Sequence, residues 1–199
     1  MKKMMCVLVA VILALTGSCA LAGTWIVPTN GNSGSSSQES SGVKATLTDD
    51  LATRSGPSTS YTGCGSYKMK GQQVTVLSRA FDNGGVQWVE VEFTYNGGYR
   101  RAWTGVKRLN ISSSKLAQVP EEDPNSYIGY GSVNARVSPR FGPGSLFATY
   151  GDRDYSRGDR VVAIKSVNGY YMVESWHTEK DGVQRILRCW IPEGNVNLD

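Results

Sequence analysis

Alternation of apolar and polar side chains in two stretches of the chain indicates β-strands. Residues 73–77 (QVTVL) are rich in β-branched side chains, and residues 88–93 (WVEVEF) alternate apolar and acidic positions. The Asn-Gly dipeptides at 83–84 and 96–97 are typical of tight hairpin turns, whose two central residues need positive φ. No part of this region keeps the apolar spacing of a helix. The pattern therefore predicts a small all-β domain over residues 43–111, with Glu90 and Glu92 on the solvated face of a strand.

The same order of features returns in the second half of the chain. Four landmarks recur 85 to 87 residues later, namely 71–74 at 158–161, 83–84 at 168–169, 96–97 at 181–182, and 101–103 at 188–190. A turn signal, Arg-x-x-Pro, recurs at a shorter interval, as Arg54 to Pro57 and Arg136 to Pro139. Recurrence at a nearly constant period predicts an internal duplication. A second all-β domain is therefore expected over residues 126–199, after an acidic, proline-bounded linker at 112–125.

The first of these units resembles the bacterial Src-homology-3-like (SH3b) family. The resemblance is carried by the run LATRSGPSTSY at 51–61, Lys70-Gly71, the predicted strand at 74–77, and a closing segment from Trp103 to Leu109. SH3b members typically open with N-V-R-S-G-P-S-T-x-Y, so Ala52 and Thr53 depart from the family pattern. Ala102 stands where the family has Gly before the closing Trp.

The second unit resembles the same family less closely. Residues 134–136 keep the Asn-x-Arg opening, whereas Ser138-Pro139 stands where the family has Gly-Pro, and Cys189 precedes the closing Trp190. A Gly-Pro pair occurs slightly later, at 142–143, so an alignment with a short insertion after residue 136 is also open. The fold class that the resemblance implies is all-β, with two small SH3-like β-barrels in tandem after a signal peptide and a flexible linker.

The resemblance implies a binding function and not a catalytic one. SH3b domains bind peptidoglycan peptides or cross-bridges and commonly target a hydrolase to the cell wall. Because no hydrolase domain accompanies the two units, the sequence favours a free-standing binder of cell-wall peptidoglycan or its peptides. The alternative is an envelope structural or protein–protein interaction module with no glycan affinity.

The first 22 residues have the pattern of a cleaved signal peptide. Two lysines precede an apolar run at 4–15, which is shorter than the roughly 20 residues that span a membrane, and a small-x-small cleavage site follows at 20–22. Lipid anchoring at Cys19 is the less favoured alternative, because a Thr stands where lipoprotein signals usually carry Leu. Residues 23–42 are rich in Ser and Gly and predict a flexible linker. We expect a secreted or envelope-associated protein with no transmembrane span in its mature chain.

Charge and composition narrow the range of partners. Removing Lys2 and Lys3 with the signal leaves 19 of the 21 basic residues against 17 acidic ones, a net charge of +2. No block of like charges remains, so no nucleic-acid partner is expected. The chain has a single histidine and no phosphate-binding glycine loop, which excludes a multi-histidine zinc site and gives no support for a nucleotide. We expect no metal and no cofactor.

Two cysteines remain after removal of the signal, one in each unit. In an exported protein Cys64 and Cys189 could form a disulfide between the domains, and two reduced, buried thiols are the alternative. A nucleophilic Cys–His pair could use only one of these thiols with His177, which is expected near a hairpin tip. No activating motif surrounds either cysteine, so the sequence predicts no catalytic residue and no enzyme.

Aromatic and arginine side chains in or beside the predicted loops are the candidate ligand contacts. Flat rings with a polar group supply contact area in the recognition of peptides and sugars, and Arg can bind a ligand carboxylate through two hydrogen bonds. The two Arg side chains could instead fix their own loops. Trp103 and Trp190 are expected in the core. The ligand-binding candidates are Tyr61, Tyr95, Tyr99 and Arg54 in the first unit, and Tyr130, Arg136, Tyr170 and Trp176 in the second.

Overall fold

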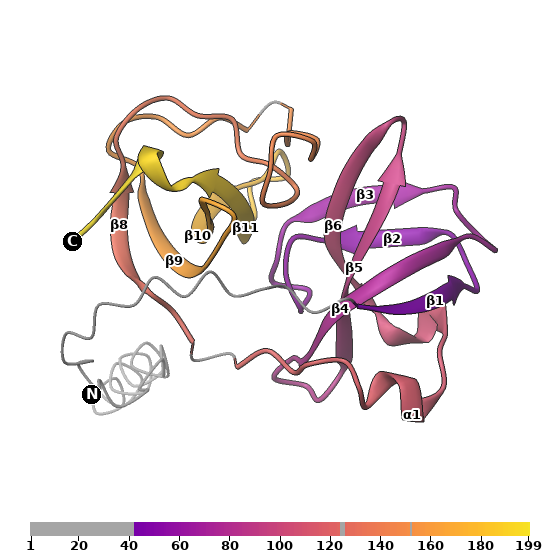
Figure 1. Cartoon of the computed structure of the whole chain (residues 1–199). Coiled ribbons are helices and arrows are strands. Elements are labelled where there is room, and N and C mark those ends of the chain that lie inside the picture. The colour runs from indigo at the N-terminus through magenta and orange to yellow at the C-terminus, as the bar shows by residue number, and fades with distance from the viewer. Residues whose placement is uncertain (1–41, 124–125, 152) are drawn as a thin grey trace, which may run out of the picture. The chain divides into compact units, whose positions relative to one another are not determined.

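The computed structural model describes residues 42–123, 126–151 and 153–199, and over these ranges the protein is all-β (Figure 1). Two antiparallel sheets, one of seven strands and one of five, contain almost all of the regular structure described. The described residues belong to one compact unit. The expected signal peptide, and the expected linker at 23–42 up to residue 41, lie outside the described residues. Within the described ranges, no helix is long and apolar enough to cross a membrane.

The first sheet contains the strands that the alternating pattern predicted. Its spatial order is β3-β2-β6-β5-β4-β1-β7, and a β-bulge in β4 near Ser78 accompanies its curl (Figure 1). A 3₁₀ turn, Val106–Arg108, joins the last two strands. The strands are β1 (Val43–Leu47), β2 (Leu51–Arg54), β3 (Gly63–Tyr67), β4 (Gln73–Phe81), β5 (Gln87–Tyr95), β6 (Gly98–Gly105) and β7 (Leu109–Asn110).

The second sheet is formed by the predicted second unit. Its spatial order is β11-β10-β9-β8-β12, and a second 3₁₀ turn, Glu193–Asn195, precedes the last strand. The strands are β8 (Gly129–Val133), β9 (Arg160–Val167), β10 (Tyr170–Thr178), β11 (Gln184–Pro192) and β12 (Val196–Leu198). Along the chain, α1 (Ser113–Leu116) lies between the strands of the two sheets. It begins after Ser112, whose side chain accepts a hydrogen bond from the backbone N–H of Lys115. Part of the expected linker is therefore ordered as a helical turn.

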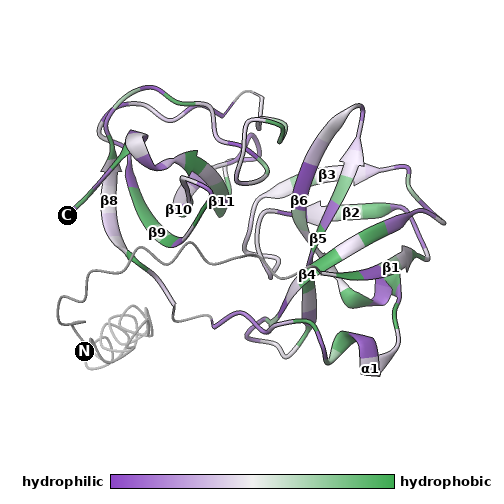
Figure 2. Cartoon of the chain, in the orientation of Figure 1, coloured by the Kyte–Doolittle hydropathy of each residue, from purple (hydrophilic) through white to green (hydrophobic). Residues whose placement is uncertain are grey.

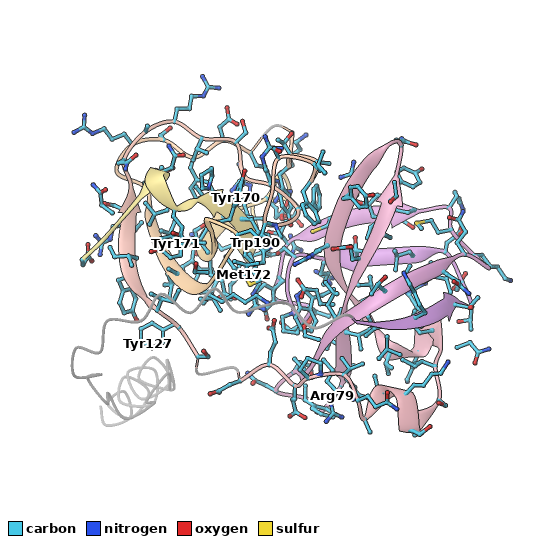
Figure 3. All side chains as sticks on the ribbon, viewed as in Figure 1. Arg79, Tyr127, Tyr170, Tyr171, Met172 and Trp190 are labelled. Carbon is cyan, nitrogen blue, oxygen red and sulfur yellow. The ribbon has the colours of Figure 1, made fainter. Side chains whose placement is uncertain are left out.

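Each sheet has its own apolar core. In the first sheet, the side chains of Val74, Val76, Val89 and Val91 are at most 1% exposed. They belong to β4 and β5, and Figure 2 colours the residues of these strands by hydropathy. Trp103 and Trp190 are 1% and 2% exposed, which confirms their expected place in the core. In the second sheet, Trp190 packs with Met172 and Val167, and with the half-buried Tyr170 (Figure 3). Tyr170 therefore belongs to this cluster.

The hairpins use two different turns. Asn96-Gly97 and Asn168-Gly169 have positive φ at both residues, which confirms the tight turns predicted for these dipeptides. The turn at 83–84 differs from the prediction, because only the following Gly85 has positive φ. There Asp82 fixes the loop through its carboxylate, which accepts hydrogen bonds from the backbone N–H groups of Gly84 and Val86.

The contacts of the two sheets recur at a nearly constant interval of 86 or 87 residues. In the first sheet Leu47 pairs with Leu109, and in the second Val133 pairs with Val196. Likewise Ala45 pairs with Val74, and Gly131 pairs with Val161. The interval exceeds the 82 residues that separate Arg54 from Arg136, so these two arginines do not occupy equivalent places.

Candidate functional site

A cleft in the second sheet is the candidate functional site. Its volume is about 410 Å³, within the range of roughly 300–1,000 Å³ that is usual for small-molecule sites. The loop that precedes β9 forms one wall, and residues of β10 and β11 form the other. The lining residues are Arg153, Asp154, Tyr155, Asp159, Arg160, Ser175, Trp176, His177 and Leu187.

Hydroxyl groups and a thiol form a buried polar cluster beside the cleft. The hydroxyl of Tyr155 lies 2.6 Å from the Oγ of Ser175 and 3.5 Å from the Sγ of Cys189. Burial raises the pKa of Tyr155 well above its usual value, so this hydroxyl stays protonated. Tyr155 is held in the loop by backbone hydrogen bonds in both directions with Val137. The cluster therefore offers neutral hydroxyls that both donate and accept.

Ion pairs engage most of the charged side chains that line the cleft. Arg153 donates to both carboxylate oxygens of Glu179, with N–O distances of 3.0 and 3.4 Å. Asp154 accepts from the Oγ of Ser138 at 2.5 Å and from the Nη2 of Arg136 at 2.6 Å, and these two partners lower its pKa. Asp154 is therefore ionised and already compensated at neutral pH.

The remaining two charged groups also have partners. The guanidinium of Arg160 donates to both carboxylate oxygens of Asp199, at 3.1 and 2.5 Å. Asp159 accepts a hydrogen bond of 2.8 Å from the backbone N–H of Ser156. Positive and negative groups are thus both present around the cleft, and none of the described Arg or Asp residues that line it lacks a polar partner.

Trp176 is the most exposed aromatic residue among those that line the cleft. Its side chain is on β10 and is 70% exposed, although it is the largest side chain in the lining. A ring of this size exposed beside polar groups is typical of a binding surface, since it costs free energy to leave it in water. Of the predicted ligand contacts, Trp176 lines the cleft, and Arg136 reaches it through Asp154.

Two predicted ligand contacts of the first unit, Arg54 and Tyr61, form hydrogen bonds within the protein instead. Arg54 donates to the backbone carbonyls of Thr59 and Tyr61, at 3.1 and 2.6 Å, and so fixes its own loop. The hydroxyl of Tyr61 donates to the carboxylate of Glu174 in the second sheet, at 2.8 Å. The expectation that the Arg side chain could fix its own loop is confirmed for Arg54. Tyr61 is half-buried against the second sheet.

Arg140, and not Arg136, is the counterpart of Arg54 in the second unit. Arg140 donates to the carbonyls of Ser145 and Phe147, at 3.1 and 2.8 Å, just as Arg54 does in its own loop. The equivalent loops are therefore Arg-Ser-Gly-Pro at 54–57 and Arg-Phe-Gly-Pro at 140–143. The predicted equivalence of Arg54 and Arg136 was wrong. It rested on the spacing from Arg to Pro, whereas the equivalent loops share the Gly-Pro pair.

The two loops make the same contact with the opposite sheet. Arg188 lies over the ring of Tyr61, with 5.3 Å from its Cζ to the ring centroid, and its Nε donates to Glu174 at 2.8 Å. Arg101 lies over the ring of Phe147 at 5.1 Å, and its Nε donates to Glu92 at 2.8 Å. A backbone hydrogen bond accompanies each contact. The N–H of Thr62 donates to the carbonyl of Ile186, and the N–H of Ala148 donates to the carbonyl of Tyr99. We call these two contacts the reciprocal loop contacts.

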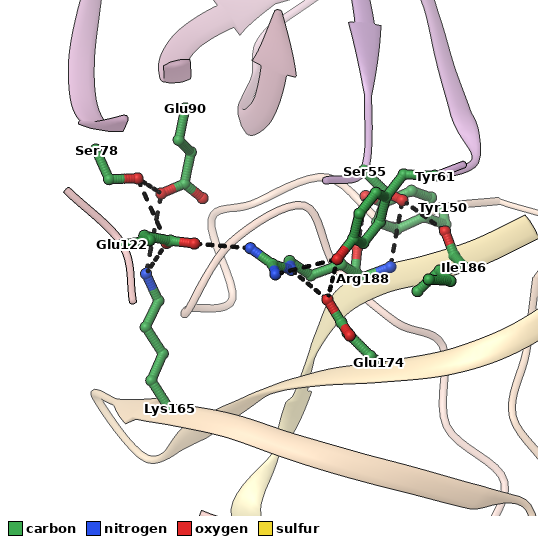
Figure 4. A network of polar contacts seen from close by, with 10 residues as sticks. All are labelled: Ser55, Tyr61, Ser78, Glu90, Glu122, Tyr150, Lys165, Glu174, Ile186 and Arg188. Carbon is green, nitrogen blue, oxygen red and sulfur yellow. Dashed lines mark hydrogen bonds and ion pairs between the residues drawn. The ribbon is translucent and has the colours of Figure 1, made fainter. Parts of the chain in front are cut away.

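A buried network of charges extends the first of these contacts (Figure 4). Glu122 accepts from Arg188 at 2.8 Å and from Lys165 at 3.2 Å. Glu90 lies 3.9 Å from the Nζ of Lys165 and accepts a hydrogen bond from Ser78. Glu90 was expected on a solvated strand face, but it is only 4% exposed, because the second sheet covers that side of β5.

The other predicted ligand contacts do not line the cleft. Tyr95 packs edge-on against Tyr67, with ring centroids 4.8 Å apart, beside the first core. Tyr99 is 45% exposed and lies beside Phe147, and Tyr130 is 44% exposed on β8. These residues, with Tyr170 in its apolar cluster, are therefore not brought together in one site.

Both cysteines are free thiols, so the disulfide expected as one alternative is not formed. Cys64 lies against the hydroxyl of Tyr150 at 3.6 Å, and that hydroxyl donates to the carbonyl of Arg188. Burial raises the pKa of both thiols to about 12. The alternative reading, two reduced thiols, agrees with the structure, which buries Cys189 fully and Cys64 in part.

Most residues of the cleft were not among the predicted ligand contacts. Arg153, Asp154 and Asp159 come from a polar loop in which no motif marks a binding site. Their one common signal is the density of charged residues at 152–160, which exceeds that of the neighbouring segments. His177 was expected near a hairpin tip, and it also lines the cleft. Among the described residues, no cluster of three or more His, Cys, Asp or Glu could hold a metal ion.

Comparison with known proteins places the chain in no family. No protein-family model, no curated protein and no solved structure matches it significantly. The function is therefore argued from the cleft and from the sequence pattern.

Proposed function

We propose that the protein is a non-catalytic, secreted or envelope-associated binding protein that binds cell-wall peptidoglycan or its peptides. In this proposal its two units are SH3b-like β-barrels in tandem. The observation that carries the proposal is the cleft in the second sheet, whose lining combines the aromatic residues Tyr155 and Trp176 with hydroxyl groups and paired charges. Such a combination of one large ring with a few directed polar groups is typical of ligand sites.

The recurring loops support the SH3b-like part of the proposal. The Arg-x-Gly-Pro segments at 54–57 and 140–143 take the same internal hydrogen bonds, at the place where the SH3b pattern has Arg-Ser-Gly-Pro. The strand pairings before and after them recur at the same interval. The corrected alignment also gives the second unit the Gly-Pro that Ser138-Pro139 lacked.

The state of the thiols supports a binding role over covalent catalysis. A nucleophilic cysteine needs a lowered pKa, whereas burial raises the pKa of both Cys64 and Cys189 to about 12. The hydroxyl of Tyr155, and not a base, stands next to Cys189. His177 is on β10 and lines the cleft, and within the described residues no hydrogen bond joins it to either thiol.

Co-sedimentation with purified peptidoglycan sacculi tests this proposal. We expect the wild-type protein to be depleted from the supernatant, and Trp176→Ala to lose at least about tenfold in affinity, or about 1.4 kcal/mol. Phe81→Ala is the matched control, because Phe81 is a 49% exposed aromatic residue on the first sheet, away from the cleft. A protein that stays in the supernatant at every salt concentration contradicts the proposal.

A second candidate function is a protein-interaction module of the envelope with no glycan affinity. It is favoured by an exposed apolar group around the start of β8, where Tyr127, Ile128 and Tyr130 are 42%, 47% and 44% exposed and Leu198 of β12 lies in the strand paired to β8. Exposed apolar residues in one place often mark a protein contact. This candidate predicts no sacculus binding, and self-association that Ile128→Ser with Tyr130→Ser abolishes in sedimentation velocity.

A further inference from the structure

We propose that the cleft binds an uncharged aromatic ring, which packs against Tyr155 as the rings of Phe93 and Tyr95 pack against Tyr67 in the first unit. The inference concerns one part of the cleft and goes beyond the proposed function, because it holds for any ligand that carries such a ring. It is carried by a comparison of equivalent positions, which are filled in the first unit and open in the second.

Tyr155 has the same place in the second unit as Tyr67 has in the first. Tyr67 is paired antiparallel with Leu51, and Tyr155 is paired in the same way with Val137. Leu51 and Val137 are separated by the same interval at which the other strand pairings of the two sheets recur. Both tyrosine side chains are buried. The two tyrosines are therefore equivalent.

The strand residues that face these tyrosines are equivalent as well. Glu92 on β5 and Glu174 on β10 mark matching positions, because each accepts from the arginine of its reciprocal loop contact. The residues that follow are Phe-Thr-Tyr at 93–95 and Ser-Trp-His at 175–177. Alternation along a strand puts the first and third residues of each triplet on the face of the tyrosine, and the middle residue on the other face. The second unit therefore has serine and histidine in place of two larger aromatic residues.

In the first unit, aromatic rings fill the space around the tyrosine. Tyr67 packs edge-on against Phe93, with ring centroids 5.0 Å apart, and against Tyr95, with centroids 4.8 Å apart. The guanidinium of Arg100 lies over the same ring, 5.7 Å from its centroid. Edge-to-face packing at such distances is a favoured arrangement of aromatic pairs, because the positive edge of one ring meets the negative face of the other.

In the second unit, the corresponding space is the cleft of about 410 Å³. In the described part of the chain no aromatic ring packs edge-on against Tyr155, and its hydroxyl lies 2.6 Å from the Oγ of Ser175 instead. Loss of a buried aromatic ring is among the most destabilising changes in a core. Proteins commonly give up stability in this way where they bind a ligand. The open space is therefore best explained as a site for a ring that comes from outside the unit.

The lining of this space suits an uncharged ring. Tyr155 and Leu187 are buried and largely apolar, whereas Ser175, directly opposite Leu187, has a hydroxyl that can form hydrogen bonds. The nearby Arg153 already donates to both carboxylate oxygens of Glu179, so a charged ligand would have to separate this pair. A ring with one hydroxyl group, as in phenol, would regain the edge-on packing and leave the charges paired.

NMR titration of the isotope-labelled protein with p-cresol, which is the tyrosine side chain as a free molecule, tests the inference. We expect saturable shifts of the backbone amide signals around Ser175 and Leu187, with a Kd of about 1 mM, as is usual for a ligand of so few atoms. Cyclohexanol has a saturated ring with one hydroxyl, and we expect it to bind at least about fivefold more weakly, because it has no aromatic face or edge. Equal binding of the two compounds contradicts an aromatic ligand and overturns the inference.

Substitution of His177 by Tyr gives the second unit the ring that the first unit has in Tyr95. It should therefore weaken the binding of p-cresol at least about tenfold. Thr178→Tyr is the matched control, because it adds the same side chain at the next residue, which is exposed on the other face of β10, and it should bind as the wild type does. Ser175→Phe restores the other ring and should show the same loss as His177→Tyr.

Circular dichroism verifies the fold of these three variants. Absence of saturable binding by the wild type overturns the inference. Unchanged binding by folded His177→Tyr or Ser175→Phe places the ring elsewhere and overturns it as well.

A capped tripeptide, N-acetyl-Gly-Tyr-Gly-amide, distinguishes the two sources of such a ring. If it shifts the same signals and binds at least as tightly as p-cresol, the ring belongs to a side chain of a partner polypeptide. If only p-cresol binds, the ring belongs to a small molecule, and both results support the inference. Co-sedimentation with sacculi reports separately on the proposed function. Depletion without p-cresol binding overturns only the inference, and p-cresol binding without depletion overturns only the proposed function.

Discussion

Gly56 and Gly142 allow an aromatic ring to lie directly against the backbone of each Arg-x-Gly-Pro loop. A Cβ atom at Gly56 would lie 2.2 Å from the Cδ1 of Tyr61, and one at Gly142 would lie 2.1 Å from the Cδ1 of Phe147. Non-bonded carbon atoms do not approach this closely, so each ring can occupy its place only because the glycine has no side chain. This explains why Gly, and not only Pro, recurs in the motif.

Replacement of Gly56 by Ala should therefore destabilise the protein. The added methyl group forces the ring of Tyr61 or the loop to move, and overpacking of this kind costs about 1–3 kcal/mol in the free energy of unfolding. Gly63→Ala is the matched control, because nothing lies within 4 Å of a Cβ at that position. Urea denaturation measures both, and equal stability of the two variants would contradict the close contact.

Single residues also show what the sequence could predict and what it could not. The burial of Trp103 and Trp190 followed from strand composition and is confirmed. The solvated position expected for Glu90 was wrong, since alternation within one strand says which side a residue faces but not what covers that side. Trp176 was chosen for its type, and its place in a cleft depends on a loop that is remote in the sequence.

At the scale of elements, local patterns predicted strands and hairpins well, and equivalent loops poorly. The Asn-Gly turns at 96–97 and 168–169 are confirmed because both residues of the turn carry the conformational preference themselves. The match of Arg54 with Arg136 failed because the hydrogen bonds of the loop depend on the Gly-Pro pair that follows Arg140. The wall of the cleft at 153–160 could not be predicted, since no local preference fixes a loop of that kind.

Substitution of Tyr61 by Phe should weaken the reciprocal loop contact of the first unit. Its hydroxyl donates to Glu174 at 2.8 Å and accepts from the Nη2 of Arg188 at 3.3 Å. Hydrogen bonds to charged groups contribute about 1.5–3 kcal/mol, so we expect a loss of about 2 kcal/mol in the free energy of unfolding. Thermal and urea denaturation measure this loss.

Tyr99→Phe is the control for this substitution. Tyr99 is 45% exposed, so removal of its hydroxyl should change stability by less than about 0.5 kcal/mol. Phe147 shows that the equivalent loop keeps its contact with Arg101 without a hydroxyl. If Tyr61→Phe is as stable as the wild type, the ring alone is enough to maintain the contact with Arg188. The role assigned to the hydroxyl would then be wrong.

At the scale of the whole described unit, a network of buried charges joins the two sheets. Glu122 comes from the segment between the sheets, Glu90 from the first sheet, and Lys165 and Arg188 from the second. Burial opposes ionisation of Glu122, but the charges of Arg188 and Lys165 outweigh it and lower its pKa. For Glu90 burial is the stronger effect and raises its pKa, although Lys165 is near. The two carboxyl groups therefore differ in the charge that each prefers.

This difference gives the two acids opposite effects on stability as the pH changes. A lowered pKa means that the contribution of Glu122 is present above its unfolded pKa and is lost as the pH falls through its folded value. A raised pKa means that the contribution of Glu90 is present below its unfolded pKa and is lost as the pH rises through its folded value. Near neutral pH, Glu122 stabilises the folded protein and ionisation of Glu90 opposes it.

Amide substitutions should separate these two effects. Glu122→Gln removes the one carboxylate that accepts from both Arg188 and Lys165, leaving Glu174 to Arg188 and the more distant Glu90 to Lys165, which should cost about 3 kcal/mol in the free energy of unfolding at pH 7. Glu90→Gln keeps the shape and removes an unfavourable charge, so it should leave stability at pH 7 unchanged or increased. Urea denaturation between pH 4 and pH 8 measures both, and each difference from the wild type should shrink as the pH falls. A loss of similar size in both variants would mean that Glu90 is held ionised by Lys165, and that the network joins the sheets through two carboxylates instead of one.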